Sequence, residues 1–129
     1  MLRSMLVCLV LASLLPGCGT SGPQTVQVRA QDAATTVRLR RGDQLAVVLA
    51  GNPTTGYTWE QSAGAPAILQ LAGEPKFKPD SEAVGAGGLV TTTFRAVGTG
   101  KTTLTLIYHR TFEPGVAPEQ TFSVEVEVS

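Results

Sequence analysis

The chain has 129 residues, which suits a single domain, and its 43% hydrophobic content supports a core without metals or disulfides. Its formal net charge is zero, with 10 basic and 10 acidic residues, and the absence of a basic block argues against nucleic acid as a partner. Only 16% of the residues are charged, while 14 glycines and 8 prolines indicate frequent turns, as in proteins rich in β-strands.

The N-terminal segment is typical of a targeting sequence. Arg3 supplies a positive charge, and residues 5–15 form an apolar run that is too short to span a membrane with ease. The run ends in the sequence LPGC, which resembles a bacterial lipobox. This resemblance implies that residues 1–17 are a signal peptide and that Cys18 carries lipid in the bacterial cell envelope. A plain signal peptide cut nearby, or an uncleaved anchor, is the alternative.

A short tether is expected between the lipid and the domain. Residues 18–24 are rich in Gly, Ser, Thr and Pro, a composition typical of flexible linkers. Cys8 leaves with the signal peptide and Cys18 is acylated, so the domain predicted for residues 25–129 has neither thiol nor disulfide.

From Thr25 onward, apolar and polar residues alternate with the two-residue period of β-strands. The expected strands lie within residues 26–28, 37–39, 45–49, 57–61, 68–71, 89–97, 102–108 and 122–128. Only residues 66–71 allow a helical turn. The pattern predicts an all-β antiparallel sandwich of about seven or eight strands, with Trp59 in its core.

Three segments interrupt the alternation and are rich in Gly, Pro or both. They are residues 50–56, 78–88 and 109–119. Alternate connections of a sandwich emerge at the same end, so these segments are expected to form one surface.

Residues for catalysis or metal binding are scarce. His109 is the only histidine, no nucleophile-elbow motif is present, and the acids are scattered. Residues 85–88 are glycine-rich, but no Lys-Ser/Thr pair follows, so they do not form a phosphate-binding loop. We therefore expect no enzymatic activity, no metal and no cofactor.

The segment NPTTGY, which starts at Asn52, is stiff and sharply turned. Pro53 fixes its own φ, Gly56 permits a positive φ, and the Asn52 side chain can bond to nearby backbone. Two hydroxyls, of Thr54 and Thr55, are left near the tip. An ordinary turn is the alternative interpretation of this segment.

The three segments together resemble the chagasin-type inhibitors of cysteine peptidases. The first loop of that family reads Asn-Pro-Thr-Thr-Gly-aromatic, which residues 52–57 match, with Trp59 where the family places a Trp. The second loop carries Gly-x-Gly-Gly, matched by residues 85–88. The third loop carries Arg-Pro-Trp or Arg-Pro-Phe, matched by Arg110 and Phe112.

The third loop departs from the family pattern at one position, because Thr111 stands in place of Pro. The loop should then be less rigid and should lose more conformational entropy on binding. The resemblance itself spans residues 25–129.

The resemblance implies an immunoglobulin-like sandwich that inhibits papain-like cysteine peptidases reversibly, plugging the active-site cleft with three loops. In such an arrangement Thr54 lies at the catalytic pair, Phe112 is an aromatic anchor with Arg110 beside it, and Gly87 and Gly88 let the backbone approach the enzyme. The implied peptidase-binding residues are Asn52, Pro53, Thr54, Thr55, Gly56, Tyr57, Gly85, Gly87, Gly88, Arg110 and Phe112. The inhibitor is expected to be a monomer held on the membrane by the lipid on Cys18.

Two other classes of function stay open at this point. A lipid-anchored immunoglobulin-like adhesion or carbohydrate-binding module would need exposed aromatic side chains, and the chain has only 4 Phe, 2 Tyr and 1 Trp. An envelope hydrolase would need catalytic residues that the sequence does not offer.

Overall fold

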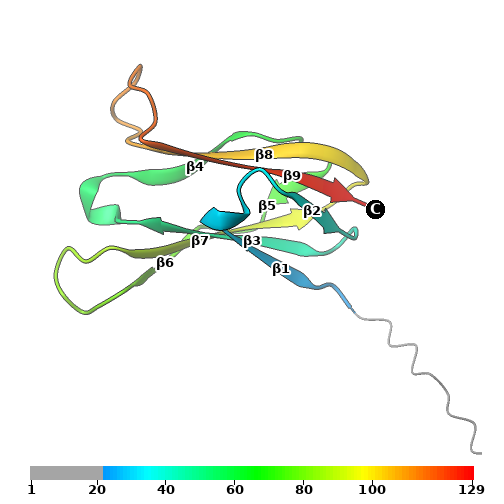
Figure 1. The fold of residues 1–129 in the computed structure, drawn as a ribbon, viewed down its shortest axis with the longest axis horizontal. Helices are drawn as coiled ribbons and strands as arrows, with labels where there is room; N and C mark the ends of the chain where they lie inside the picture. The colour runs from blue at the N-terminus through cyan, green and yellow to red at the C-terminus, as the bar shows by residue number, and fades with distance from the viewer. Residues whose placement is uncertain (1–21) are drawn as a thin grey trace, which may run out of the picture.

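A computed structural model describes residues 22–129, which form two β-sheets packed face to face (Figure 1). The signal peptide predicted for residues 1–17 and the acylation predicted at Cys18 lie outside the described residues. Among the residues described, no helix is long and apolar enough to cross a membrane.

Nine strands and two short 3₁₀ turns account for the regular structure of residues 22–129. They are β1 Thr25–Arg29, η1 Ala30–Asp32, β2 Thr36–Leu39, β3 Gln44–Gly51, η2 Pro53–Thr55, β4 Thr58–Ala63, β5 Leu69–Leu71, β6 Lys76–Pro79, β7 Gly88–Ala96, β8 Gly100–His109 and β9 Gln120–Val128. The all-β sandwich predicted from the alternating runs is confirmed.

The two layers have different strand orders. One sheet runs β1-β3-β7-β5, with β6 also paired to β7, and the other runs β2-β9-β8-β4. The core lies between them, and its most buried large side chains include Phe94, Leu45 and Leu104, each 0% exposed. Trp59 is 8% exposed, so its predicted burial is confirmed.

The prediction of purely antiparallel sheets is wrong at two edges. Strand β1 pairs parallel with β3, and β2 pairs parallel with β9. The reason is the connection through η1, which carries the chain from one sheet to the other, so β1 and β2 do not form a hairpin. A two-residue alternation shows which residues face the core but says nothing about the direction of the neighbouring strand.

Strand β6 was not expected, because its second half lies in the irregular segment 78–88 and its first half was not assigned to any strand. All four of its residues are exposed, and it forms by pairing with the first half of β7. Residues 65–69 do contain one helical turn, in which the N–H groups of Ile68 and Leu69 both donate to the carbonyl of Ala65 at 3.0 Å. Strand β5 follows that turn directly.

Candidate functional site

Three loops lie together at one end of the sandwich, away from the end at which the chain enters β1 (Figure 1). The first loop (residues 52–57) joins β3 to β4, the second loop (residues 80–87) joins β6 to β7, and the third loop (residues 110–119) joins β8 to β9. The expectation that the three irregular segments share one surface is therefore confirmed.

Asn52 organises the first loop. It caps η2, and its Oδ1 accepts the backbone N–H of Thr54 at 3.1 Å and the Thr54 hydroxyl at 2.6 Å. The Thr55 hydroxyl donates to the Asn52 carbonyl at 2.7 Å. Both threonine protons are thus engaged within the loop, so toward a partner these hydroxyls offer lone pairs rather than donors. Gly56 ends the turn with a φ of 81°, which confirms the positive φ predicted for it.

An aromatic stack supports the first loop from the side of the core. Tyr57 stacks on Tyr108 with ring centroids 5.1 Å apart, and Trp59 stacks on the same ring at 5.0 Å. The Tyr108 hydroxyl accepts the Asn52 backbone N–H at 2.9 Å, and the Trp59 Nε1–H donates to the Ala50 carbonyl at 3.0 Å. Both ends of the loop are therefore fixed to the core.

The second loop is linked directly to the first. The Asn52 Nδ2–H donates to the Gly85 carbonyl at 3.0 Å, and the Asp80 N–H donates to the Gly87 carbonyl at 3.0 Å, which closes the loop. Gly88 is buried at the start of β7, where a β-carbon would overlap the Lys78 carbonyl oxygen of β6. The need for glycine at this position thus arises within the fold, whereas the resemblance had implied a close approach to a peptidase there.

Arg110 joins the third loop to the first. Its Nε–H donates to the Thr55 carbonyl at 3.0 Å, and its guanidinium lies over the Tyr57 ring at 4.4 Å. Its Nη1–H donates to Glu113 Oε1 at 3.0 Å, and this bond raises the pKa of Arg110, which stays a cation at any working pH. The arginine is therefore engaged inside the molecule.

Phe112 lies against the first loop and is 67% exposed. A β-carbon on Gly56 would lie 3.0 Å from Cε1 of Phe112, a tight contact, and the φ of 81° at this position favours glycine. The first loop is thus the central one, with the second and third loops on its flanks.

Sequence reasoning missed three residues of this surface. Val84 in the second loop is fully exposed, Val116 in the third loop is 61% exposed, and Glu113 holds Arg110. Three of the five exposed large hydrophobic residues found between residues 22 and 129 lie in these two loops. A valine between small and acidic residues of a Gly-rich segment was the available signal for Val84.

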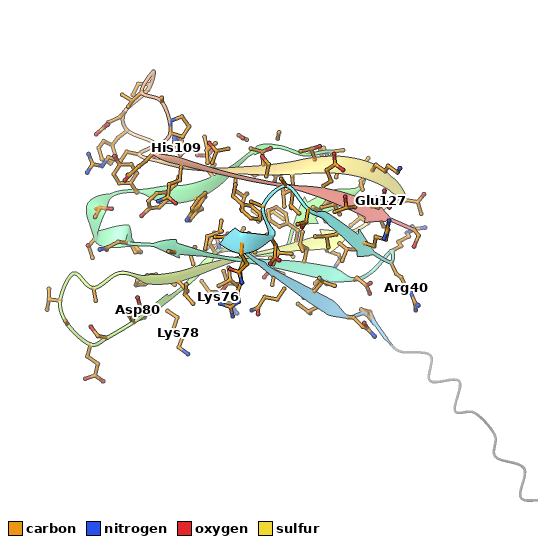
Figure 2. The ribbon with its side chains drawn as sticks, viewed as in Figure 1. Arg40, Lys76, Lys78, Asp80, His109 and Glu127 are labelled. Atoms are coloured by element: carbon orange, nitrogen blue, oxygen red, sulfur yellow. The ribbon has the colours of Figure 1, made fainter. Side chains whose placement is uncertain are left out.

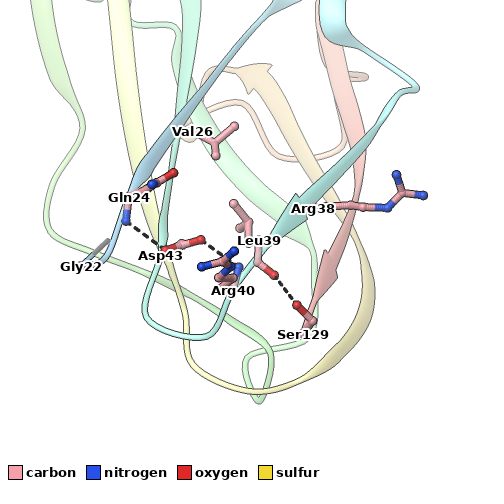
Figure 3. A pocket seen from close by; sticks show the side chains of 8 residues that line it. All are labelled: Gly22, Gln24, Val26, Arg38, Leu39, Arg40, Asp43 and Ser129. Carbon is pink, nitrogen blue, oxygen red and sulfur yellow. Dashed lines mark hydrogen bonds between the residues drawn. The ribbon is translucent and has the colours of Figure 1, made fainter. Parts of the chain in front are cut away.

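The remaining candidates do not assemble into a catalytic or metal site. His109 lies at the end of β8, and its Nε2 is 2.7 Å from Glu60 Oε2. No group of three metal-ligating side chains occurs within residues 22–129. A hollow of about 270 Å³ lies at the end of the sandwich opposite the three loops and is lined in part by Asp43 (Figure 3). The Asp43 carboxylate already accepts hydrogen bonds from the backbone N–H groups of Gln24 and Arg40.

Comparison with known proteins decides the family. Residues 38–126 match the Chagasin family peptidase inhibitor I42. The chain belongs to the chagasin family. Amoebiasin-1 from Entamoeba histolytica is 30% identical to it over 97 residues, which cover 73% of this chain and 90% of that protein. The match to a peptidase inhibitor family confirms that the protein is not an enzyme and leaves the adhesion and carbohydrate-binding alternative without support.

Two solved structures share the fold with this chagasin-family protein. The cysteine protease inhibitor EhICP2 from Entamoeba histolytica gives a TM-score of 0.72 at 23% identity, covering 82% of this chain and 96% of that chain. PbICP-C, solved in complex with falcipain-2, gives a TM-score of 0.58 at 18% identity, covering 82% of this chain and 99% of that chain. These two matches show the shared fold, and the family match over residues 38–126 confirms the predicted resemblance to the chagasin-type inhibitors.

Proposed function

We propose that the three loops enter the active-site cleft of a papain-like cysteine peptidase and inhibit it reversibly, without forming a covalent bond. The observation that carries this proposal is the direct hydrogen bonding among the loops, from Asn52 to Gly85 and from Arg110 to Thr55. Family membership supports the class of target. None of the three loops contains a cysteine, so the enzyme thiol has no partner for a disulfide there.

The mechanism follows from the stiffness of the central loop. Fixing the backbone of one residue costs about 1–2 kcal/mol, and a loop that is already ordered avoids most of that loss on binding. Thr54 at the tip of the first loop then covers the catalytic thiolate and imidazolium, while Phe112 packs on one flank and the second loop on the other. Truncation at the centre of such an interface typically costs about 2 kcal/mol or more.

Titration of papain with the protein tests this function. Inhibition should be complete, activity should recover fully after dissociation, and serine peptidases and metallopeptidases should be unaffected. Thr54→Ala should weaken inhibition while lowering thermal stability only slightly, because the backbone N–H of Thr54 still donates to Asn52 Oδ1. A covalent adduct in the mass spectrum of the complex would refute the reversible mechanism, and unimpaired papain would refute the function itself.

We also propose that the inhibitor is a monomeric lipoprotein held on a membrane of the bacterial cell envelope by lipid on Cys18. The apolar run that ends in LPGC supports this proposal. In the fold, the chain enters β1 at the end opposite the three loops, so an anchor there leaves the loops accessible (Figure 1).

A further inference from the structure

The outer face of the five-stranded sheet gathers positive charge from three strands. In β3, Leu45, Val47 and Leu49 belong to the core cluster, so the alternate residues Ala46 and Val48 face outward. The charged residues of β1, β6 and β7 on that outward side are all cations. They are Arg29, Lys76, Lys78 and Arg95, which we call the basic face.

The strand register places these four side chains on one surface. Lys76 is opposite Thr91, Thr91 is opposite Val48, and Val48 is opposite Arg29, so one row crosses β6, β7, β3 and β1. Neighbouring strands lie about 4.8 Å apart, so the row is roughly 14 Å long. Lys78 lies two residues along β6 from Lys76, and Arg95 lies four residues along β7 from Thr91, which keeps both on the same side.

None of the strands β1, β3, β5, β6 and β7 contains an acidic residue, although Asp80 directly follows β6 and lies near Lys78 in Figure 2. The four cations of the basic face are not neutralised by ion pairs. All four side chains belong to exposed residues, and within residues 22–129 none of them takes part in a salt bridge. Asp32 follows β1, but its carboxylate accepts the backbone N–H of Arg29 at 2.8 Å. The Arg29 guanidinium donates only to Gln27, at 3.3 Å.

The opposite sheet differs in its charge pattern. Its outer face carries Glu127 between Arg38 and Lys101, at 3.2 and 3.3 Å, and Glu60 beside His109. In Figure 2, Lys76 and Lys78 lie on the other side of the molecule from His109 and Glu127. The positive charge is therefore a property of one face and not of the whole surface, since the formal net charge of the chain is zero.

We propose that the basic face lies against an anionic phospholipid surface. The choice of this partner rests on the proposed lipid anchor. Cys18 precedes Thr25 by seven residues, so an extended tether reaches at most about 25 Å, and it enters the sheet through β1, a strand of the basic face. An acyl anchor combined with a basic patch is a common two-part membrane signal. A sheet lying flat in this way leaves the three loops free at its end.

The chain supplies its own probes for a test, because it has three lysines, of which Lys76 and Lys78 lie on the basic face and Lys101 on the other. The mature acylated protein is added to vesicles of phosphatidylcholine alone, or of phosphatidylcholine and phosphatidylglycerol in equal parts. Amine acetylation is then followed by mass spectrometry. Acetylation of Lys76 and Lys78 should slow several-fold in the anionic vesicles, while Lys101 is unaffected, and high salt should abolish the difference.

Charge-removing variants make the test specific. Arg29→Gln with Arg95→Gln removes two cations of the basic face, each worth roughly a fivefold change in partitioning near an anionic surface, and should reduce the protection of both lysines. The matched single variants are Arg95→Gln on the basic face and Arg38→Gln on the opposite sheet, which remove the same charge, and only Arg95→Gln should reduce the protection. Equal effects of the two single variants, or equal labelling of all three lysines in both vesicles, would overturn the proposal.

The same experiments distinguish a failure of the basic-face proposal from a failure of the proposed lipid anchor or of the proposed peptidase inhibition. A protein without the lipid anchor would not stay with the neutral vesicles, whereas binding to the anionic ones would still report the basic face. Papain inhibition by the Arg29→Gln, Arg95→Gln variant should equal that of the wild type. Weaker inhibition by this variant, with no lysine protection on vesicles, would mean that the basic face contacts the peptidase and that the membrane assignment is wrong.

Discussion

Asn52 has two separate tasks in the first loop, because its two side-chain atoms point to different partners. Oδ1 accepts from Thr54 and caps η2, while Nδ2–H reaches the Gly85 carbonyl of the second loop. Substitutions at this one position can therefore separate the order of the first loop from its connection to the second.

Asn52→Ala should lower the free energy of unfolding by about 1 kcal/mol, the usual effect of losing a cap, and should weaken papain inhibition roughly tenfold. Asn52→Asp keeps the Oδ1 acceptor that caps η2 but places a carboxylate oxygen against the Gly85 carbonyl, so it should preserve the cap and break the link to the second loop. Urea unfolding and inhibition constants measure the two effects. An Asn52→Ala protein that inhibits as the wild type does would show that the cap is unimportant for binding.

Arg110 should act by positioning the first loop rather than through its charge alone. Lysine cannot donate in a fork to both the Thr55 carbonyl and Glu113, so Arg110→Lys should weaken inhibition nearly as much as Arg110→Ala. In the free protein, both variants should speed the amide exchange of Thr55 and Gly56. Wild-type exchange rates combined with lost inhibition would instead indicate that Arg110 contacts the peptidase directly.

At the scale of the elements, the two adjacent glycines before and in β7 should behave differently. A β-carbon on Gly88 would meet the backbone of β6, lying 2.7 Å from Cα of Pro79, whereas one on Gly87 would have its nearest contact at 3.6 Å, the Gly51 carbonyl oxygen.

Gly88→Ala should therefore separate β6 from β7 and lower stability by roughly 1–3 kcal/mol, the range typical of overpacking. Gly87→Ala is the matched control and should unfold at nearly the wild-type temperature, so that any loss of inhibition it causes reports crowding against the peptidase. Equal melting temperatures for the two variants would contradict this difference.

The turn between β2 and β3 should make stability depend on pH through Asp43. The backbone N–H groups of Gln24 and then Arg40 lower the pKa of Asp43 below its ordinary value of 3.8. A carboxylate with a lowered pKa stabilises the fold above its unfolded pKa, and the stabilisation is lost as the pH falls through the folded pKa.

Asp43→Asn should accordingly have a lower urea midpoint than the wild type at neutral pH. The difference should shrink below pH 3.8 and disappear once the wild-type carboxyl is protonated. Glu127 also has a lowered pKa, through its bonds from Lys101 and then Arg38, but it is present in both proteins and cancels in the comparison. A difference that is constant over the whole acid range would exclude Asp43 as its source.

At the scale of the whole molecule, the anchor should be separable from the inhibitor. Cys18→Ser removes the acceptor of the lipid and should either release the protein from the membrane fraction or block its processing. Fractionation of cells and the mass of the N-terminus measure both outcomes. Unchanged processing and membrane association in this variant would refute acylation as the anchor.

Much of the site could be predicted from the sequence, because the first loop is governed by local interactions. Pro53, Gly56 and Asn52 restrict a few neighbouring dihedrals, and the turn, its cap and the positive φ all follow from these residues. The two-residue alternation likewise predicted eight of the nine strands and the burial of Trp59. Successive side chains of a strand point to opposite faces, so the pattern of neighbouring residues shows which face is buried.

The tertiary structure alone decided the features that depend on pairing between distant segments. The parallel edges, the strand β6 and the basic face arise from which strands become neighbours, and the local alternation does not encode this choice. The same holds for Arg110, whose partner Thr55 is 55 residues away. The sequence by itself determined the family, the stiff first loop and the sandwich, whereas the contacts that lock the three loops together required the chain to be folded.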